Sequence, residues 1–319
     1  MADHAVLITG VAGFIGSTLA RALLRDGAHV VGLDDFNDYY DPARKRDNVA
    51  ELRDDDRFTL CEQDIRDGAA VERIVAEHRP DAIAHLAAYG SVRYSVGRSA
   101  LYGEVNIMGS VNVLEAARRN DVPHVLFAST SSVYGQCDRA PFVETDPCNE
   151  PLAPYPASKK AVEVLGHTYH HLHGMHFTAV RFFNVYGPRG RPDMMPYLVT
   201  RRIVREEPIE LFDGGRLQRD WTYVDDVIDG VCAAMARPDG YRIINLGRGE
   251  PVIMSDFVEL IENLTGRSAK LIDKPAPPTE PKLTFASTEK ARRLLGYDPK
   301  VSLAEGLSRF WAWYREAEG

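Results

Sequence analysis

Residues 5–16 read AVLITGVAGFIG, a short apolar run followed by glycines at positions 10, 13 and 16. The run predicts a buried β-strand, and the apolar periodicity from Phe14 to Arg25 predicts a helix directly after the turn. Glycines at this spacing allow a tight turn, close approach of the backbone to a pyrophosphate, and close packing of the helix on the strand. We therefore predict that a dinucleotide phosphate binds at this helix N-terminus, against Gly10, Gly13, Phe14, Ile15 and Gly16.

A second predicted strand, from His29 to Leu33, is followed by Asp34. Asp34 lies roughly 20 residues beyond the glycines, where a carboxylate can bind the hydroxyl groups of the adenosine ribose. This favours NAD over NADP, because the 2′-phosphate of NADP would face a negative charge. Asn37, in the loop that follows, is a further cofactor candidate. The alternative is a glycine-rich turn that binds no ligand, which the strand, the helix and the spaced acid together make the weaker interpretation.

Strands and helices continue to alternate as far as residue 181. The expected strands are 58–60, 82–86, 124–128 and 177–181, and the expected helices are 69–78, 101–119 and 155–173. This order predicts an α/β fold with a doubly wound parallel sheet of the Rossmann type, whose ligands bind beyond the carboxyl ends of the strands. Two loops at that edge are cofactor candidates, with packing as the alternative. Asp64 and Ile65 could hold the adenine, and Ala87 and Ala88, which follow the candidate Leu86, offer small residues against which the cofactor can lie.

The sequence pattern changes after Phe183, where prolines and short segments replace the regular alternation of strands and helices. We predict an NAD-binding domain formed by residues 1–184 and 219–247. A smaller, discontinuous α+β lobe, formed by residues 185–218 and 248–319, would bind the substrate. A terminal amphipathic helix, Leu303 to Tyr314, is expected to pack on this lobe through Trp311 and Trp313.

The residues between 130 and 159 carry the predicted chemistry. Thr130 belongs to a hydroxyl cluster after an apolar strand, and Tyr155 and Lys159 stand four residues apart on the next helix. An ammonium close to a phenol, with Pro156 starting the helix, is expected to bring the pKa of Tyr155 down towards neutral pH. Such a phenol can take a proton from a sugar hydroxyl while the nicotinamide takes the hydride, so Thr130, Tyr155 and Lys159 are the catalytic candidates.

Composition limits the other classes of function. The net charge of −8 argues against a nucleic-acid partner, and no apolar stretch approaches the roughly 18 residues of a membrane span. The beginning of the chain does not read as a signal peptide, and the four cysteines show no metal or redox spacing, so a cytoplasmic location is expected. Five histidines between positions 167 and 176 could share a helix face, but no cysteine or carboxylate completes a metal site, and we expect no metal.

These motifs resemble those of the extended short-chain dehydrogenase/reductases, and in particular their nucleotide-sugar epimerases. Within that family the chain is most similar to the UDP-glucuronate 4-epimerases, in the runs at residues 37–42, 92–95, 181–183, 185–189, 191–194 and 219–226. It departs from their pattern at Ser91, at Asn184 and in Pro277-Pro278-Thr279-Glu280. The last change removes an arginine that could help to hold the nucleotide, whereas Glu280 keeps an acid for the ribose. The resemblance also implies a homodimer that pairs the helices near residues 101–119 and 155–173.

The resemblance implies 4-epimerisation of a UDP-hexuronic acid with bound NAD. Tyr155 would take the proton of the 4-hydroxyl, Thr130 would hydrogen-bond the reacting oxygen, and Lys159 would bind the nicotinamide ribose. Arg219 would face the diphosphate, Arg93 is either a second anion contact or a loop-stabilising residue, and Phe212 and Glu280 complete the nucleotide site. The 4-keto intermediate is a β-keto acid, so the enzyme must hold the C5 carboxylate out of alignment with the carbonyl to prevent loss of carbon dioxide. Ser131, Ser132 and Arg191 are the candidates for this grip.

Three alternatives remain open. Asn184 is typical of enzymes for neutral sugars and favours epimerisation of a UDP-hexose. Decarboxylation to a pentose is the second, although related decarboxylases and dehydratases have a glutamate at the position of Ser132, which cannot act as an acid or base in its place. The third is a non-catalytic NAD-binding scaffold, which the complete set of Thr130, Tyr155 and Lys159 disfavours.

Overall fold

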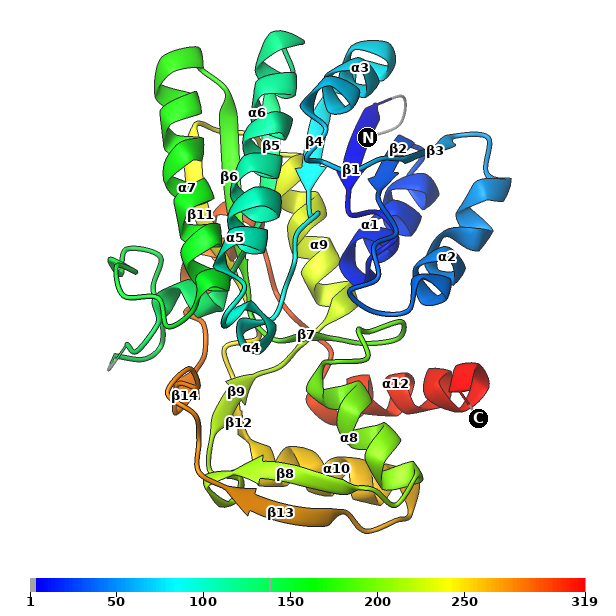
Figure 1. Ribbon diagram of the computed structural model, residues 1–319, viewed down its shortest axis with the longest axis vertical. Helices are drawn as coiled ribbons and strands as arrows, with labels where there is room; N and C mark the ends of the chain where they lie inside the picture. Colours follow the sequence, from blue (N-terminus) through cyan, green and yellow to red (C-terminus); the bar gives the residue numbers. More distant parts are fainter. Residues whose placement is uncertain (1–3, 138, 319) are drawn as a thin grey trace.

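The computed structural model describes residues 4–137 and 139–318. Its centre is a parallel sheet with the strand order β11-β6-β5-β4-β1-β2-β3 (Figure 1). The strands of this sheet are β1 (Ala5–Thr9), β2 (His29–Asp34), β3 (Phe58–Glu62), β4 (Ala82–His85), β5 (His124–Thr130), β6 (His176–Phe182) and β11 (Tyr241–Leu246). The predicted doubly wound fold is confirmed, and the strand order reverses between β1 and β4.

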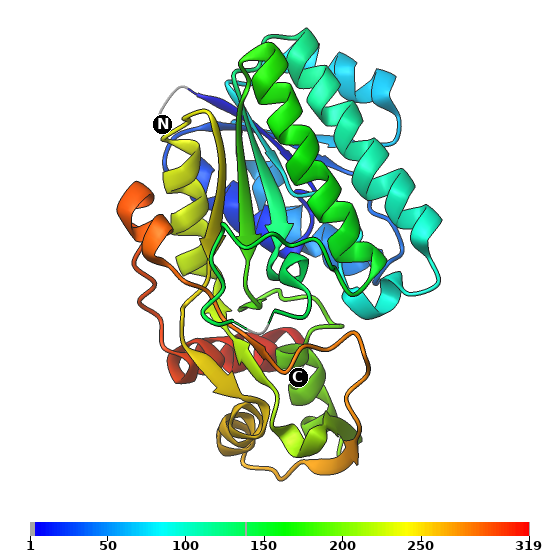
Figure 2. The same cartoon turned by 90° about the vertical axis from the view of Figure 1, so that its left-hand side faces the viewer.

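Helices cover both faces of the sheet. The α-helices of the described chain, in order, are α1 (Phe14–Arg25), α2 (Pro42–Ala50), α3 (Gly68–His78), α4 (Val92–Ser95), α5 (Ser99–Tyr102), α6 (Gly109–Arg119), α7 (Pro154–His173), α8 (Met195–Val204), α9 (Val224–Met235), α10 (Met254–Thr265), α11 (Glu289–Leu295) and α12 (Leu303–Glu318), of which α8, α10 and α12 belong to the smaller lobe. Alternate residues of β1 face opposite layers, as its pleat requires. Val6 joins the core with α1, α2 and α9, whereas Leu7 joins the core with α3, α6 and α7. Figure 2 shows α6 and α7 side by side on the second of these faces.

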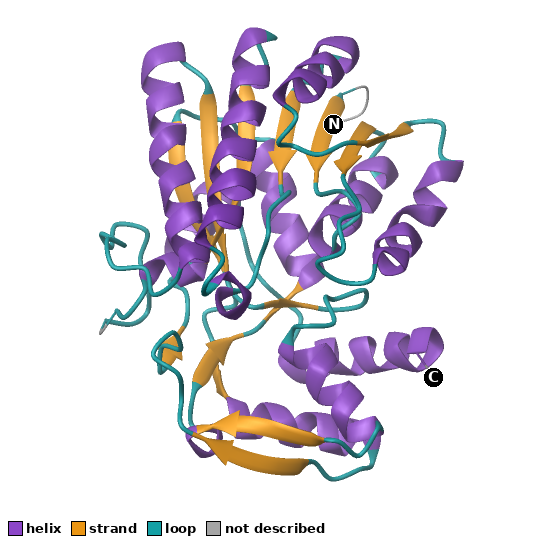
Figure 3. Cartoon of the chain, in the orientation of Figure 1, coloured by secondary structure: helices purple, strands orange, loops and turns teal. Residues whose placement is uncertain are grey.

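A smaller lobe lies below the carboxyl ends of the central strands (Figures 1 and 3). It contains three small sheets, which pair β7 (Val185–Tyr186) with β10 (Thr222–Tyr223), β8 (Pro208–Phe212) with β13 (Lys270–Lys274), and β9 (Gln218–Asp220) with β12 (Pro251–Ile253) and β14 (Leu283–Thr284). Helices α8, α10 and α12 pack with them. The chain returns once more to the central layer, because α11 contacts α9 and β11.

The terminal helix is anchored differently from the prediction. Its buried residues are Leu303, Gly306, Leu307, Phe310 and Tyr314, which recur every three or four positions. Trp311 and Trp313 are only partly buried, at the edge of a cluster around Tyr197 of α8. The tryptophans pack on the lobe as expected, with the centre of the Trp313 ring 6.5 Å from that of the Tyr197 ring, but the smaller aromatic and aliphatic residues occupy the inner face of the helix and provide its main contacts.

The predicted helix from 101 to 119 contains a π-helical turn, Gly103–Met108, between α5 and α6. Asn106 lies in this turn, and its amide nitrogen donates hydrogen bonds to the Tyr89 carbonyl and to the Ser158 hydroxyl of α7, both at 3.0 Å. The turn therefore connects the helix to the start of the catalytic helix, a placement in keeping with the frequent occurrence of π-turns at functional sites.

Candidate functional site

One cavity of about 570 Å³ lies between the carboxyl ends of the central strands and the lobe, and every site residue predicted from the sequence lines it. The predicted cofactor residues among them are Gly10, Gly13, Phe14, Ile15, Gly16, Asp34, Asn37, Asp64, Ile65, Leu86, Ala87, Ala88, Tyr155 and Lys159. The remaining ones are Thr130 and the substrate candidates Arg93, Ser131, Ser132, Asn184, Arg191, Phe212, Arg219 and Glu280. A sequence span of more than 270 residues thus converges on one space.

Two positions of the glycine turn, Gly10 and Gly16, have no room for a side chain. Gly10 has a φ of +73°, and a Cβ there would lie 2.7 Å from the Ala87 nitrogen. A Cβ on Gly16 would lie 2.2 Å from the Gly10 carbonyl oxygen, so the helix could not approach the turn as closely. Gly13 is the N-cap of α1, and within the described chain no side chain caps this end. The first amides of α1 therefore remain available to an anion.

Asp34 at the end of β2 is buried, and its carboxylate holds the backbone of the glycine turn in place. Its carboxylate accepts hydrogen bonds from the backbone N–H of Ala12 at 3.0 Å and of Phe36 at 2.9 Å. Burial nevertheless raises the pKa of Asp34 above its ordinary value. Each carboxylate oxygen keeps a second acceptor position, so Asp34 can still receive a ribose hydroxyl. Asp64 accepts two bonds from Arg66, at 2.8 and 2.6 Å, and its side chain is thus held by a local ion pair.

Thr130, Tyr155 and Lys159 come together where β5 ends and α7 begins. The helix starts one residue earlier than predicted, with Pro154 rather than Pro156 at its first position. Lys159 is buried, its ammonium lies 4.7 Å from the centre of the Phe127 ring, and burial lowers its pKa to about 7. Burial also raises the pKa of Tyr155, an effect that the adjacent Thr130 hydroxyl and the charge of Arg191 oppose. The predicted lowering by Lys159 is not found, because the lysine is itself destabilised as a cation by the same burial.

A second polar cluster beneath the catalytic residues was missed in the sequence. Glu163 accepts a hydrogen bond from the Ser129 hydroxyl at 2.6 Å and a bidentate pair of bonds from Arg181 at 2.8 Å. Glu163 lies four residues after Lys159 and eight after Tyr155, so that all three share a helix face. This spacing was the signal that could have revealed it.

Three of the predicted substrate residues pair with one another. Glu280 accepts from Arg93 at 3.0 and 2.9 Å through one oxygen and from Arg219 at 2.8 Å through the other. The Arg93 guanidinium also lies 4.9 Å from the centre of the Phe212 ring. Two guanidinium groups with one carboxylate leave a net positive charge at this end of the cavity, which suits a diphosphate.

The hydroxyl cluster and Arg191 occupy the region nearest Tyr155. The Thr130 hydroxyl accepts a hydrogen bond from the Ser132 backbone N–H at 3.2 Å and donates to the Ser132 hydroxyl at 3.3 Å. Arg191 forms a bidentate ion pair with Asp193, which in turn accepts a hydrogen bond from the Tyr39 hydroxyl at 2.9 Å. Asp193 and Tyr39 were not predicted, although both lie in the runs that carried the resemblance.

The described residues contain no group of three or more histidine, cysteine or acidic side chains placed to hold a metal ion. His167 and His171 stack on the surface of α7, with ring centres 6.3 Å apart. The search of residues 4–137 and 139–318 also finds no helix long and apolar enough to cross a membrane.

The sequence of residues 6–247 matches the NAD dependent epimerase/dehydratase family. The chain belongs to this family. The resemblance drawn from the motifs is thereby confirmed, and the seven-stranded sheet is the one that members of the family share.

Relatives of this epimerase/dehydratase match over nearly the whole chain. It is 40% identical over 312 residues to the UDP-glucuronate 4-epimerase of Thermodesulfobacterium geofontis, covering 97% of this chain and 96% of the relative. The structure of UDP-glucuronic acid 4-epimerase from Bacillus cereus, in complex with UDP-glucuronic acid and NAD, is 35% identical with a TM-score of 0.92 and covers 98% and 99% of the two chains. UDP-glucose 4-epimerase from Thermotoga maritima, with UDP-glucose, is 31% identical with a TM-score of 0.91, covering 99% and 100%.

The cavity of this epimerase/dehydratase fits NAD. The uncapped start of α1 suits the pyrophosphate, and the second acceptor positions of Asp34 suit the ribose hydroxyls. Lys45, missed in the sequence, projects towards the same loop and donates to the Asn37 carbonyl and side-chain oxygens at 2.8 and 2.9 Å. At the opposite end, Lys159 lies in the cavity wall beside Tyr155, at hand for the second ribose.

Proposed function

We propose that this protein converts UDP-glucuronate to UDP-galacturonate by epimerisation at C4. NAD, when bound, would accept the C4 hydride and return it. The phenol of Tyr155 would take the proton of the 4-hydroxyl and later return it, and Thr130 would hydrogen-bond the same oxygen. Lys159 would hold the nicotinamide ribose. The relatives that carry this activity match the chain from end to end, which supports the assignment.

The observation that carries the choice of a uronate is the closeness of Arg191 to Tyr155. The carboxylate of a hexuronic acid is attached to C5, next to the C4 that reacts, so its binding group must lie beside the catalytic phenol. In this structure Nη1 of Arg191 lies against Gly90, whose carbonyl accepts a hydrogen bond from the Tyr102 hydroxyl at 2.6 Å. The Tyr102 ring in turn meets the Tyr155 ring, with centres 6.2 Å apart, so Arg191 and Tyr155 line the same part of the cavity. A guanidinium is well suited to a carboxylate, and we assign Arg191, with Ser131 and Ser132, to the C5 carboxylate.

Two other activities remain as alternatives. Asn184 lines the cavity and favours epimerisation of a neutral UDP-hexose, the activity named for the Thermotoga maritima relative. Decarboxylation is disfavoured by Ser132, whose hydroxyl lies 3.3 Å from that of Thr130 at a position where a carboxyl would be needed.

The test is incubation of the purified protein with UDP-glucuronate without added NAD, followed by separation of the products. UDP-galacturonate without carbon dioxide supports the proposal, since the cofactor is regenerated in each turnover. UDP-pentose with carbon dioxide would assign decarboxylation. Conversion of UDP-glucose, with UDP-glucuronate unchanged, would assign the neutral-sugar reaction.

We also propose the domain division made from the sequence, with residues 1–184 and 219–247 binding NAD and residues 185–218 and 248–319 binding the UDP-sugar, while α11 of the latter segment packs on the central layer. The position of the cavity between the central sheet and the lobe supports it. Limited proteolysis with and without a UDP-sugar would test it, because ligand binding across the boundary should protect both segments.

A cytoplasmic location is proposed as well. The four free thiols agree with a reducing cytoplasm, which localisation of a tagged protein would test.

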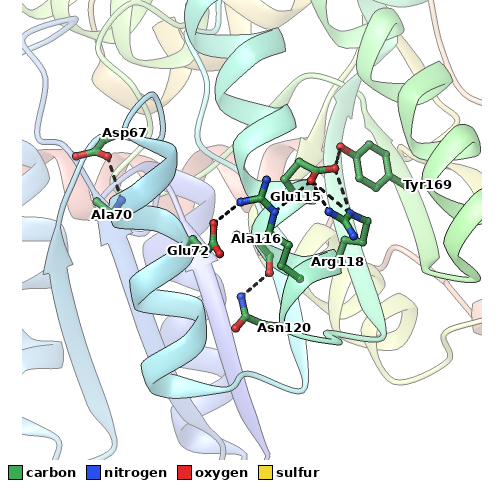
Figure 4. A network of polar contacts seen from close by, with 9 residues as sticks. Asp67, Ala70, Glu72, Glu115, Ala116, Arg118, Asn120 and Tyr169 are labelled. Carbon is green, nitrogen blue, oxygen red and sulfur yellow. Dashed lines mark hydrogen bonds and ion pairs between the residues drawn. The ribbon is translucent and has the colours of Figure 1, made fainter.

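A homodimer through α6 and α7 is the proposed assembly. Val164 and Leu172 on α7 and Met108 before α6 are apolar side chains with 57%, 64% and 55% of their surface exposed. Figure 4 shows how the two helices are held in register, with the Tyr169 hydroxyl of α7 donating to Glu115 of α6 at 2.7 Å. Sedimentation of the wild type and of Leu172→Glu tests the proposal, which a monomeric wild type would exclude.

A further inference from the structure

Arg191 is held in place by two residues, Asp193 and Tyr39, that come from distant parts of the sequence and are hydrogen-bonded to each other. Its Nε and Nη2 atoms donate to the two oxygens of Asp193, each at 2.9 Å. Asp193 Oδ2 also accepts from the Tyr39 hydroxyl at 2.9 Å, across 154 positions of sequence. The guanidinium lies 5.7 Å from the centre of the Tyr39 ring, so Tyr39 contacts both members of the ion pair. The three side chains form a unit, here called the Arg191 clamp.

The clamp leaves one edge of the guanidinium free. Nε and Nη2 face Asp193, and Nη2 also lies 3.7 Å from the Met194 sulfur. Nη1 has no hydrogen-bond partner among the described residues and lies against Gly90, where an added Cβ would be 2.3 Å from it. Gly90 and Arg191 both line the cavity. The bonds to Asp193 therefore set the direction of Nη1, the donor that is left for a ligand. Nη1 can occupy this place only because residue 90 is a glycine.

Tyr39 also connects the clamp to the cofactor loop. Its backbone N–H donates to the Asn37 side chain at 3.2 Å, and the same oxygen accepts from Lys45 at 2.9 Å. Asn37 is one of the residues that we assign to NAD. The loop that follows β2 thus meets the cofactor at one end and the Asp193–Arg191 pair at the other.

We propose that Tyr39, Asp193 and Gly90 determine the preference for a uronate, by fixing the free edge of Arg191 towards the C5 carboxylate. This inference rests on the proposed function. Asp193 offsets much of the charge of Arg191, so the clamp contributes direction more than general attraction for anions. A carboxylate held in one direction also remains out of alignment with the C4 carbonyl, whereas a guanidinium that could swing would let it turn. Loss of the clamp therefore releases carbon dioxide from the β-keto acid, leaving an enol that takes up a proton to give the 4-keto-pentose.

The experiment measures binding of UDP, UDP-glucose and UDP-glucuronate to the NAD-loaded enzyme by calorimetry, with product analysis for the uronate. Tyr39→Phe keeps the ring and removes only the hydroxyl. We expect it to weaken UDP-glucuronate binding about tenfold, to leave the binding of UDP and UDP-glucose within about twofold, and to raise the fraction of UDP-4-keto-pentose, the product of decarboxylation. Gly90→Ala is the second variant. The atom that its Cβ meets is the end of a flexible side chain, so the guanidinium moves while the fold is kept, and the same selective loss is expected.

Tyr94→Phe is the matched control. Its ring meets that of Tyr39 edge-on, with centres 4.9 Å apart, but its hydroxyl makes no hydrogen bond to another described residue, and no change of preference is expected. Equal weakening of all three ligands in Tyr39→Phe would overturn the inference, and so would an unchanged preference. The proposed function fails separately, if the wild type leaves UDP-glucuronate unconverted. A wild type that converts it, but binds it no more tightly than UDP-glucose, overturns the inference alone.

Discussion

Glu163 and Arg181 form a bidentate ion pair in which neither side chain is exposed to solvent. The pair joins the catalytic helix α7 to β6, and Ser129 adds a hydrogen bond from the residue before Thr130. The Arg181 guanidinium also lies 4.7 Å from the centre of the Tyr134 ring. Thr130 and Tyr155 therefore belong to elements that are fastened together one layer below the cavity, which fixes their relative position.

Removing one partner of this pair should be costly. Arg181→Met removes the bidentate counter-ion of the buried Glu163 carboxylate and leaves only the longer contact with Lys160, at 3.5 Å. We expect a loss of about 3 kcal/mol in the free energy of unfolding. The double variant Glu163→Leu/Arg181→Met removes both charges and should recover much of that loss. Urea unfolding at pH 7 measures both. A double variant no more stable than the single one would show that the pair does not act through burial of an unpaired charge.

Lys159 gives the cofactor-free protein an unusual dependence on pH. Burial lowers its pKa from 10.5 to about 7, so between these values the unfolded chain binds a proton that the folded protein lacks. Stability should consequently rise with pH across this window, by up to about 1.4 kcal/mol per unit. Lys159→Met should remove the rise, and Lys282→Met, at an exposed lysine, should retain it. Unfolding by urea at pH 7, 8 and 9 compares the slopes, and identical slopes in all three proteins would contradict the buried ammonium.

The proton transfer assigned to Tyr155 has a direct test. Tyr155→Phe keeps the ring contact with Tyr102, whose centre is 6.2 Å away, and removes the group that exchanges the proton. Turnover should fall by about 10²–10⁴-fold or more, while NAD remains bound. Product separation gives the rate, and release of nucleotide from the denatured protein gives the occupancy. Substantial activity in the variant would exclude the mechanism, whereas loss of NAD would show that the hydroxyl serves cofactor binding instead.

The parts of the site that could be predicted are those that local spacing encodes. The glycine turn, Asp34 at a strand end, and Tyr155 one helical turn from Lys159 each follow from a short segment and its periodicity. The pairs Tyr39–Asp193 and Arg93–Glu280 could not be predicted, because their partners are 154 and 187 positions apart and meet only once the lobe is folded against the sheet.

The effect of Lys159 on Tyr155 was misjudged for a related reason. Spacing shows that the two side chains share a helix face, but it does not show how deeply that face is buried. Burial disfavours both the phenolate and the ammonium, and this tertiary property outweighs the proximity on which the prediction relied. The π-turn at Asn106 escaped prediction likewise, since the periodicity of 101–119 is that of a continuous helix.

Glu115 makes the α6–α7 surface sensitive to acid. Its carboxylate accepts hydrogen bonds from Arg118 at 2.8 Å and from the Tyr169 hydroxyl at 2.7 Å, as Figure 4 shows, and these bonds lower its pKa to about 2. A depressed carboxylate pKa stabilises the fold above the ordinary value of 4.5, and the contribution is lost as the pH falls from there towards 2. Because the pair is partly solvated, screening limits the contribution to about 1 kcal/mol. Glu115→Gln should therefore be less stable than the wild type at pH 7, with the difference shrinking below pH 4.5.

Glu77→Gln, at an exposed position on α3, is the control and should follow the wild type throughout. Thermal unfolding between pH 7 and pH 3 measures the stability of all three proteins. A difference between Glu115→Gln and the wild type that stays constant with pH would mean that the carboxylate contributes through packing and not through its charge.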